Sequence, residues 1–257
     1  MDRKYFFFDI DGTLTDIKTH KIVPSALVSL RELELKGHFV AIATGRAHYK
    51  ARSFMEEIKL HNMVCNGGVG LVVNDKLIEN KPLDLIKAKA IIKEAIINNI
   101  GVLVMLDDSI NLYGKDNLFR EQVGERRENT IYNIYSDFDF DSLSVIYKIY
   151  LSVSQEDQSK LKLIDTLGYL RFAPEYLMIQ YDEKQNGIIN MINIMNGNIE
   201  DIVVFGDDYN DLVMFDKRWT SIAMGNACQE LKDKADYITD SNINDGIYNA
   251  CKKFGWI

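Results

Sequence analysis

The sequence predicts an α/β protein with a doubly wound, mainly parallel sheet, interrupted by an inserted α+β domain. Short apolar segments alternate with helical patterns near the N-terminus and again after Lys184. The apolar segments are continuous runs, which is typical of strands covered on both faces. Between the two alternating regions the pattern changes to hairpins and longer helices. The predicted core domain therefore comprises residues 1–81 and 183–257, and the inserted domain residues 82–182.

The first alternating region follows a β-α-β-α-β order. Pro24 can begin a helix and Gly37 can end it, with leucines at helical spacing between them. The predicted strands cover residues 5–10, 39–43 and 63–65, and a second helix covers 47–59.

After residue 68 the alternation of strands and helices gives way to hairpins. Turn residues separate the paired apolar runs 70–73 and 76–79, which lie at the end of the core segment, and the runs 102–106 and 110–113, which lie in the inserted region. The predicted helices cover 83–99 and 155–167, the latter with Ser154 as its N-cap, and predicted strands cover 170–172 and 177–181.

After Lys184 the alternation resumes. The predicted elements are a helix over 186–195, strands over 202–205 and 222–224, a helix over 229–235, a strand over 237–238 and a final helix from 245.

Composition narrows the class of protein. The 257 residues are 47% hydrophobic and 26% charged, as expected for a globular chain with a real core. A net charge of −8 argues against nucleic acid as the default partner. The initial apolar run is too short for a secretory signal and no later run has the length of a membrane span, so we expect a cytoplasmic protein without a membrane partner. Three cysteines far apart indicate free thiols.

Polar residues follow the predicted strands where their carboxyl ends meet, which is where doubly wound sheets place their sites. Asp9 and Asp11 follow the first strand and, two residues apart, point to the same side of an extended chain. Two adjacent carboxylates repel each other unless a cation lies between them. Gly12 permits the tight backbone that follows.

Two further aspartates strengthen the case for a cation. Asp207 and Asp211 lie in "GDDYND", directly after the strand over 202–205. Oxygen ligands without histidine or cysteine favour Mg²⁺ over Zn²⁺. Each motif alone is often a turn or a capped helix, but their combination with Thr44 and Lys184 predicts an active site.

These motifs together resemble the haloacid dehalogenase-like (HAD) superfamily. "DIDGTLT" is similar to its first motif, Thr44 of "ATGR" to its second, Lys184 to its third and "GDDYND" to its fourth. The segments "NGG", "AMGNA" and "ADYITDSNINDGI" resemble the Cof-type phosphatases, whose α+β cap lies between the second and third motifs. The likeness covers the whole core, while the insertion matches in position and length. One departure is that Gln185 and Asn186 precede Gly187, where the group often has glycine directly after the lysine.

The resemblance implies a Mg²⁺-dependent phosphatase that hydrolyses small phosphomonoesters, such as sugar phosphates or phosphorylated cofactors, through an aspartyl-phosphate. Asp9 would be the nucleophile, and Asp11 the general acid and base. Asp208 would either add a metal ligand or face solvent. The resemblance also implies a set of metal ligands, which are Asp9, the backbone carbonyl of Asp11, Asp207 and Asp211. Asp211 would hold a water on the metal or orient Lys184. The residues implied to bind phosphate or the rest of the substrate are Gly12, Thr44, Gly45, Arg46, Lys184 and Asn210.

The inserted domain is expected to act as the cap that selects the substrate, with a hinge at its two linkers. A phosphomutase of the phosphomannomutase type shares the core and the "DGTLT" start, and would need a bisphosphate activator. A non-catalytic sugar-phosphate-binding regulator would have no need of the Asp9–Asp11 pair, and a dehalogenase no need of Asp11 and the Mg²⁺ ligands. The motifs leave the physiological substrate and the oligomeric state open.

Overall fold

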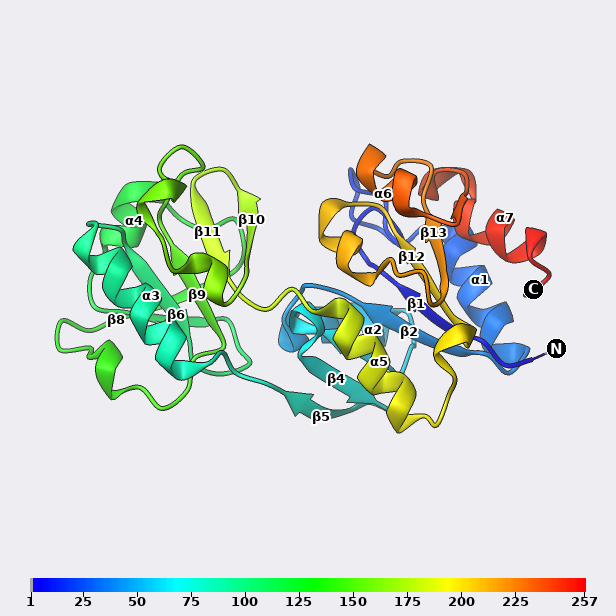
Figure 1. The fold of residues 1–257 in the computed structure, drawn as a ribbon, viewed down its shortest axis with the longest axis horizontal. Coiled ribbons are helices and arrows are strands. Elements are labelled where there is room, and N and C mark those ends of the chain that lie inside the picture. The colour runs from blue at the N-terminus through cyan, green and yellow to red at the C-terminus, as the bar shows by residue number, and fades with distance from the viewer. Residues whose placement is uncertain (1) are drawn as a thin grey trace. The chain divides into compact units, whose positions relative to one another are not determined.

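The computed structural model describes residues 2–257, which form two compact units (Figure 1). One unit combines the chain up to Asn80 with Glu183–Ile257, and the other is Lys81–Asp182. Among the residues described, no helix is both long enough and apolar enough to span a membrane.

The first unit is built on an eight-stranded sheet in the order β14-β13-β12-β1-β2-β3-β4-β5. Its strands are β1 (Tyr5–Phe8), β2 (Phe39–Ala43), β3 (Met63–Cys65), β4 (Gly70–Val73), β5 (Lys76–Asn80), β12 (Ile202–Gly206), β13 (Thr220–Ala223) and β14 (Tyr237–Ile238). β1 lies between β12 and β2 and pairs in parallel with both, whereas β4 and β5 are antiparallel. The predicted α/β fold class is confirmed.

Helices cover both faces of this sheet. The apolar cluster on one face joins α1 (Pro24–Leu35), α2 (His48–Glu57) and α7 (Gly246–Lys253), and α1 and α7 lie side by side (Figure 1). The cluster on the other face joins α5 (Lys184–Ile194) and α6 (Gln229–Lys234). Phe6 and Phe8 of β1 belong to the first cluster, and Tyr5 and Phe7 to the second. Burial on both faces explains why this strand is a continuous apolar run.

The second unit has its own six-stranded sheet, in the order β10-β11-β9-β6-β7-β8. Its elements are α3 (Leu85–Ile97), β6 (Val102–Met105), β7 (Asn111–Gly114), α4 (Leu118–Val123), β8 (Ile131–Ile134), β9 (Lys148–Leu151), β10 (Tyr169–Ala173) and β11 (Tyr176–Ile179). Side chains of α3 pack with those of β6, β9 and β11 in a separate apolar cluster. This unit therefore has the core that an independently folding domain requires.

The predicted helix over 155–167 is wrong. The Ser154 side chain accepts a hydrogen bond from the N–H of Asp157 at 3.3 Å, but only two short 3-10 turns follow, η3 (Gln158–Lys160) and η4 (Ile164–Thr166). Glu94 of α3 accepts the N–H groups of Lys162 and Leu163 at 2.7 and 3.0 Å. A continuous helix would need those same N–H groups for its own carbonyls, so the contact with α3 replaces the helix.

Candidate active site

The site begins where β1 ends. The Asp9 N–H donates to the carbonyl of Phe205 at 3.1 Å, which extends the pairing of β1 with β12 and holds Asp9 on a fixed backbone. The Asp9 side chain is buried, and its Oδ2 accepts the N–H of Asp11 at 3.0 Å. Gly12 then turns the chain with φ +86°, and a Cβ on it would lie 2.0 Å from Oδ2 of Asp207. Glycine is required here for both conformation and space.

The end of β12 supplies the second pair of carboxylates. Oδ1 of Asp207 accepts the hydroxyl of the buried Thr13 at 2.8 Å, and Oδ2 of Asp211 accepts the N–H of Asp207 at 2.9 Å. Asp211 lies on the 3-10 helix η6 (Tyr209–Met214). Asp208 is exposed and caps η6 by accepting the N–H of Tyr209 at 2.8 Å, so it faces solvent, outside the group of carboxylates that could hold a metal.

Lys184 is fully buried and is the first residue of α5, two residues before the predicted start. Its Nζ donates to Oδ1 of Asp9 at 2.9 Å and to Oδ1 of Asp211 at 2.6 Å. The first turn of α5 can lie this close to the site because Gly187 packs on the backbone of Gly68. A Cβ on Gly187 would lie 2.4 Å from the Gly68 carbonyl oxygen. The glycine three residues after the lysine thus allows the close approach of α5.

The residues that follow β2 lie at the same edge of the sheet. Thr44 and Gly45 are buried, and the Thr44 hydroxyl oxygen accepts the N–H of Arg46 at 3.2 Å. The Arg46 guanidinium donates to both carboxylate oxygens of Asp11, from Nε at 2.9 Å and from Nη2 at 2.5 Å. Asn210 is half-buried on η6, next to Asp211.

Three aspartates could hold a metal ion. Asp9, Asp207 and Asp211 are all buried, and each offers an oxygen within 4.8 Å of the others. Three carboxylates and one lysine leave an excess of two negative charges when all are ionised, which a divalent cation would balance. An all-oxygen donor set suits Mg²⁺, and the residues therefore fit the ion that the sequence predicts. The Asp11 carboxylate is outside this cluster, and the use of its backbone carbonyl as a metal ligand stays a prediction.

Burial and mutual repulsion perturb the protonation of these groups. Burial, then the charges of Asp9 and Asp211, raise the pKa of Asp207 to about 8. Burial and then Asp211 raise the pKa of Asp9 to about 7, although Lys184 lowers it. Burial opposes the charge on Lys184, but Asp211 and Asp9 outweigh it and raise the pKa of the lysine above its ordinary value. Without a cation the cluster thus retains protons at neutral pH.

Two asparagines support the first loop, and sequence reasoning did not single them out. The Asn226 amide donates to the carbonyl of Gly12 at 2.9 Å, and its Oδ1 accepts the N–H of Asn242 at 2.9 Å. The Asn242 amide donates to the carbonyl of Thr15 at 2.7 Å. Both lie in segments, "AMGNA" and "SNIND", that resemble the Cof-type group, which was the only available signal.

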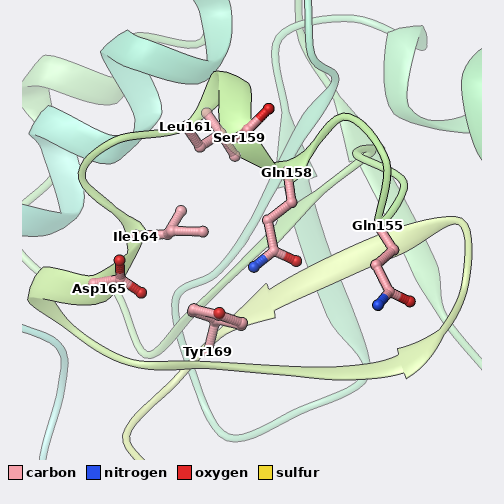
Figure 2. Close-up of a pocket in the computed structure, with 7 residues that line it drawn as sticks. All are labelled: Gln155, Gln158, Ser159, Leu161, Ile164, Asp165 and Tyr169. Atoms are coloured by element: carbon pink, nitrogen blue, oxygen red, sulfur yellow. The ribbon is translucent and has the colours of Figure 1, made fainter.

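The unit Lys81–Asp182 has a pocket of its own. Figure 2 shows the Gln158 amide and the Tyr169 ring facing the same hollow. The full lining is Gln155, Gln158, Ser159, Leu161, Ile164, Asp165 and Tyr169. None of the predicted site residues lines it.

Comparison with known proteins shows the family to which this chain belongs. The family profile of haloacid dehalogenase-like hydrolases matches residues 6–251, and the chain belongs to that family. It is 29% identical over 267 residues to YkrA of Bacillus subtilis (strain 168), covering 99% of each chain. It is 26% identical over 257 residues to the 5-amino-6-(5-phospho-D-ribitylamino)uracil phosphatase YcsE of the same organism, covering 98% of this chain and 96% of YcsE.

Solved structures agree. A structure described as the HAD subclass IIB sugar phosphatase BT4131 superposes with a TM-score of 0.80 at 25% identity, covering 99% of this chain and 100% of that one. The resemblance to Cof-type HAD hydrolases is therefore confirmed over the whole length, including the inserted unit. The protein is a HAD-like hydrolase.

Proposed function

We propose that this protein is a Mg²⁺-dependent phosphatase that hydrolyses small phosphomonoesters through an aspartyl-phosphate on Asp9. The observation that carries the proposal is the buried cluster at the end of β1. Asp9, Asp207 and Asp211 converge there with Lys184, and Asp11 lies beside them with a half-exposed carboxyl group. A protein that only bound phosphate would not need three buried carboxylates, which repel an anion.

The chemistry follows from the two aspartates of the first loop. A carboxylate oxygen of Asp9 attacks phosphorus, the bond to the leaving oxygen breaks, and Asp11 gives that oxygen its proton. Asp11 then takes a proton from water as the water attacks the aspartyl-phosphate, which releases phosphate and restores Asp9. Bound Mg²⁺ would neutralise phosphoryl charge and align the phosphoryl group.

Other residues hold the phosphoryl oxygens and the ion. Asp9, Asp207 and the backbone carbonyl of Asp11 would hold Mg²⁺. Both oxygens of Asp211 accept hydrogen bonds, from Lys184 and from the N–H of Asp207, which supports a role in orienting the lysine. Thr44, Lys184 and Asn210 would donate to the equatorial oxygens, where charge spreads in the transition state.

The substrate class rests on what the core can recognise and on the relatives. The residues gathered at the strand ends suit a phosphoryl group, and the relative YcsE is named for a phosphorylated ribityl compound. We assign this chain to phosphomonoesters of comparable size. Recognition of the rest of the substrate is the proposed task of the unit Lys81–Asp182.

The test is a screen of phosphorylated metabolites for release of inorganic phosphate. Turnover should disappear in EDTA and return with Mg²⁺, while Ca²⁺ should restore little because its coordination is looser. Undiminished turnover in the chelated protein would contradict the mechanism. A phosphomutase would instead release little phosphate and require a bisphosphate activator.

A further inference from the structure

The guanidinium of Arg46 is committed to Asp11. Nε and Nη2 each donate to a different oxygen of the carboxylate, at 2.9 and 2.5 Å. Such a two-point fork fixes the plane of the carboxylate as well as its position, which a single donor cannot do. The segment after β2 therefore determines how the side chain after β1 is oriented.

The backbone of Arg46 is itself anchored. Its N–H donates to the Thr44 hydroxyl oxygen at 3.2 Å, and its carbonyl accepts the N–H of Asn66 at 2.7 Å. The Arg46 side chain is 23% exposed and that of Asp11 is 46% exposed. The arginine is thus the fixed partner, and the carboxylate keeps an open side.

We propose that Arg46 is a positioning residue for the general acid and base, and that it acts on the reaction through Asp11 instead of binding the substrate. The inference rests on the proposed phosphatase function. A carboxylate has about four lone-pair sites, so a fork that occupies two leaves others to exchange a proton with the leaving oxygen and with water. Because proton transfer depends on alignment, a misplaced carboxyl group should slow it strongly.

The leaving group provides a selective test of this role. An alkyl phosphate such as glycerol phosphate needs a proton on its leaving oxygen, whereas p-nitrophenyl phosphate leaves as a stable phenolate. Loss of alignment at Asp11 should therefore slow formation of the aspartyl-phosphate far more from the alkyl ester than from the aryl ester. The later hydrolysis of that intermediate also uses Asp11 but is the same for both substrates, so the comparison is made on kcat/KM, which covers only the steps up to the intermediate. Loss of a contact with the phosphoryl group would slow both equally, because that group is the same in both substrates.

The variant is Arg46→Lys, which keeps the positive charge and removes the fork. We expect kcat/KM to fall about 10- to 100-fold more for glycerol phosphate than for p-nitrophenyl phosphate. The control is Arg52→Lys, an exposed residue of α2 that pairs with Glu56, which should alter neither substrate. Equal losses in kcat/KM for the two substrates would overturn the proposal in favour of direct substrate binding.

A double-mutant cycle with Asp11→Asn tests the coupling. If Arg46 acts through Asp11, then Arg46→Lys, which alone should lower kcat/KM for glycerol phosphate strongly, should cost little further activity toward that substrate once Asp11 is already Asn. The cycle is repeated with the urea midpoint of unfolding, a measurement that requires no turnover. The sum of the losses in the two single variants should exceed the loss in the double variant. Additive effects on the midpoint would overturn the pairing. Absence of phosphate release by the wild-type protein would instead overturn the phosphatase function alone.

Discussion

Asp9 and Asp11 are separated by a single residue along the chain but lie in opposite surroundings. Asp9 is buried, with Lys184 on one oxygen and the Asp11 N–H on the other. Asp11 is half-exposed and held by Arg46. A fixed, cation-paired carboxylate suits a nucleophile, and an accessible one suits an acid that must exchange its proton with water.

The two aspartates should therefore fail in different ways when changed. Asp9→Asn removes the attacking oxygen, and we expect no turnover and no covalent labelling by phosphate analogues. Asp11→Asn should retain substrate and Mg²⁺ binding but lose about 10²-fold or more in kcat. Steady-state kinetics and labelling followed by mass spectrometry measure both effects. Near-normal turnover of Asp11→Asn would refute its assignment as acid and base.

The carboxylate cluster should also make the metal-free protein sensitive to pH. The pKa of Asp207 in the folded protein is raised from 3.8 to about 8, so the folded state holds a proton that the unfolded state loses. The contribution of Asp207 to the free energy of unfolding should then be largest below about pH 4, and it should be lost as the pH rises through about 8. Asp207→Asn should flatten that dependence and raise the Tm of the metal-free protein at pH 8.

The control for this change is Asp233→Asn, an exposed aspartate of α6. Added Mg²⁺ should raise the Tm of the wild-type protein and of the control, because the ion binds only the folded state, and should do so far less for Asp207→Asn. Thermal unfolding at several pH values measures each effect. If the Tm of Asp207→Asn depended on pH as steeply as that of the wild-type protein, Asp207 would not be the group whose raised pKa causes the dependence.

At this scale the sequence is informative where a site residue follows directly from a strand. Asp9, Asp207 and Thr44 each follow a continuous apolar run, so their meeting at one edge of the sheet could be expected. The contacts of Arg46 with Asp11 and of Asn226 with Gly12 could not be expected. They join segments that are far apart in the chain, and no periodic pattern encodes them.

At the scale of elements, α5 is the part of the fold on which Lys184 depends. The helix approaches η1 (Asn66–Gly68) so closely that a methyl group does not fit between Gly187 and the Gly68 carbonyl oxygen. We expect Gly187→Ala to displace the first turn of α5 and to lower kcat at least about 10-fold, since small misplacements of a catalytic group are costly. Asn190→Ala, at an exposed position of the same helix, should be near neutral or slightly favourable.

Phosphate-release kinetics and the Tm of both variants measure this prediction. A Gly187→Ala protein that folds and turns over normally would mean that α5 can shift without moving its lysine.

Elements differed in how well they could be predicted. β2 and β3 have the predicted bounds, because buried parallel strands give unbroken apolar runs with clear ends. The short edge strand β14 also has the predicted bounds, although its Ile238 is exposed. The region 155–167 has helical spacing and a competent cap, yet Glu94 takes the N–H groups that a helix would need. Local propensity was overridden by a side chain more than sixty residues away.

At the scale of the whole molecule, the two units have separate apolar cores. Exchange of Lys81–Asp182 for the corresponding segment of another Cof-type phosphatase should therefore leave each core intact. We expect the chimaera to prefer a different phosphomonoester while its Mg²⁺ requirement is unchanged, because the residues proposed to bind the metal and the phosphoryl group all stay in the first unit. A ranked substrate screen of both proteins provides the measurement. A folded chimaera with the original ranking would contradict the proposed division of labour.

The position of β1 at the middle of its sheet has a consequence for biosynthesis. β1 can pair with β2 soon after both leave the ribosome, but its other neighbour, in the register Tyr5↔Ile202, is translated only after the entire inserted unit. During that interval one edge of an aromatic strand has no partner, and such edges favour aggregation. The inserted unit meanwhile has all of its own strands and can fold first. A nascent chain of this protein should therefore expose β1 to chaperones for most of its synthesis, and a polypeptide truncated before β12 should be insoluble.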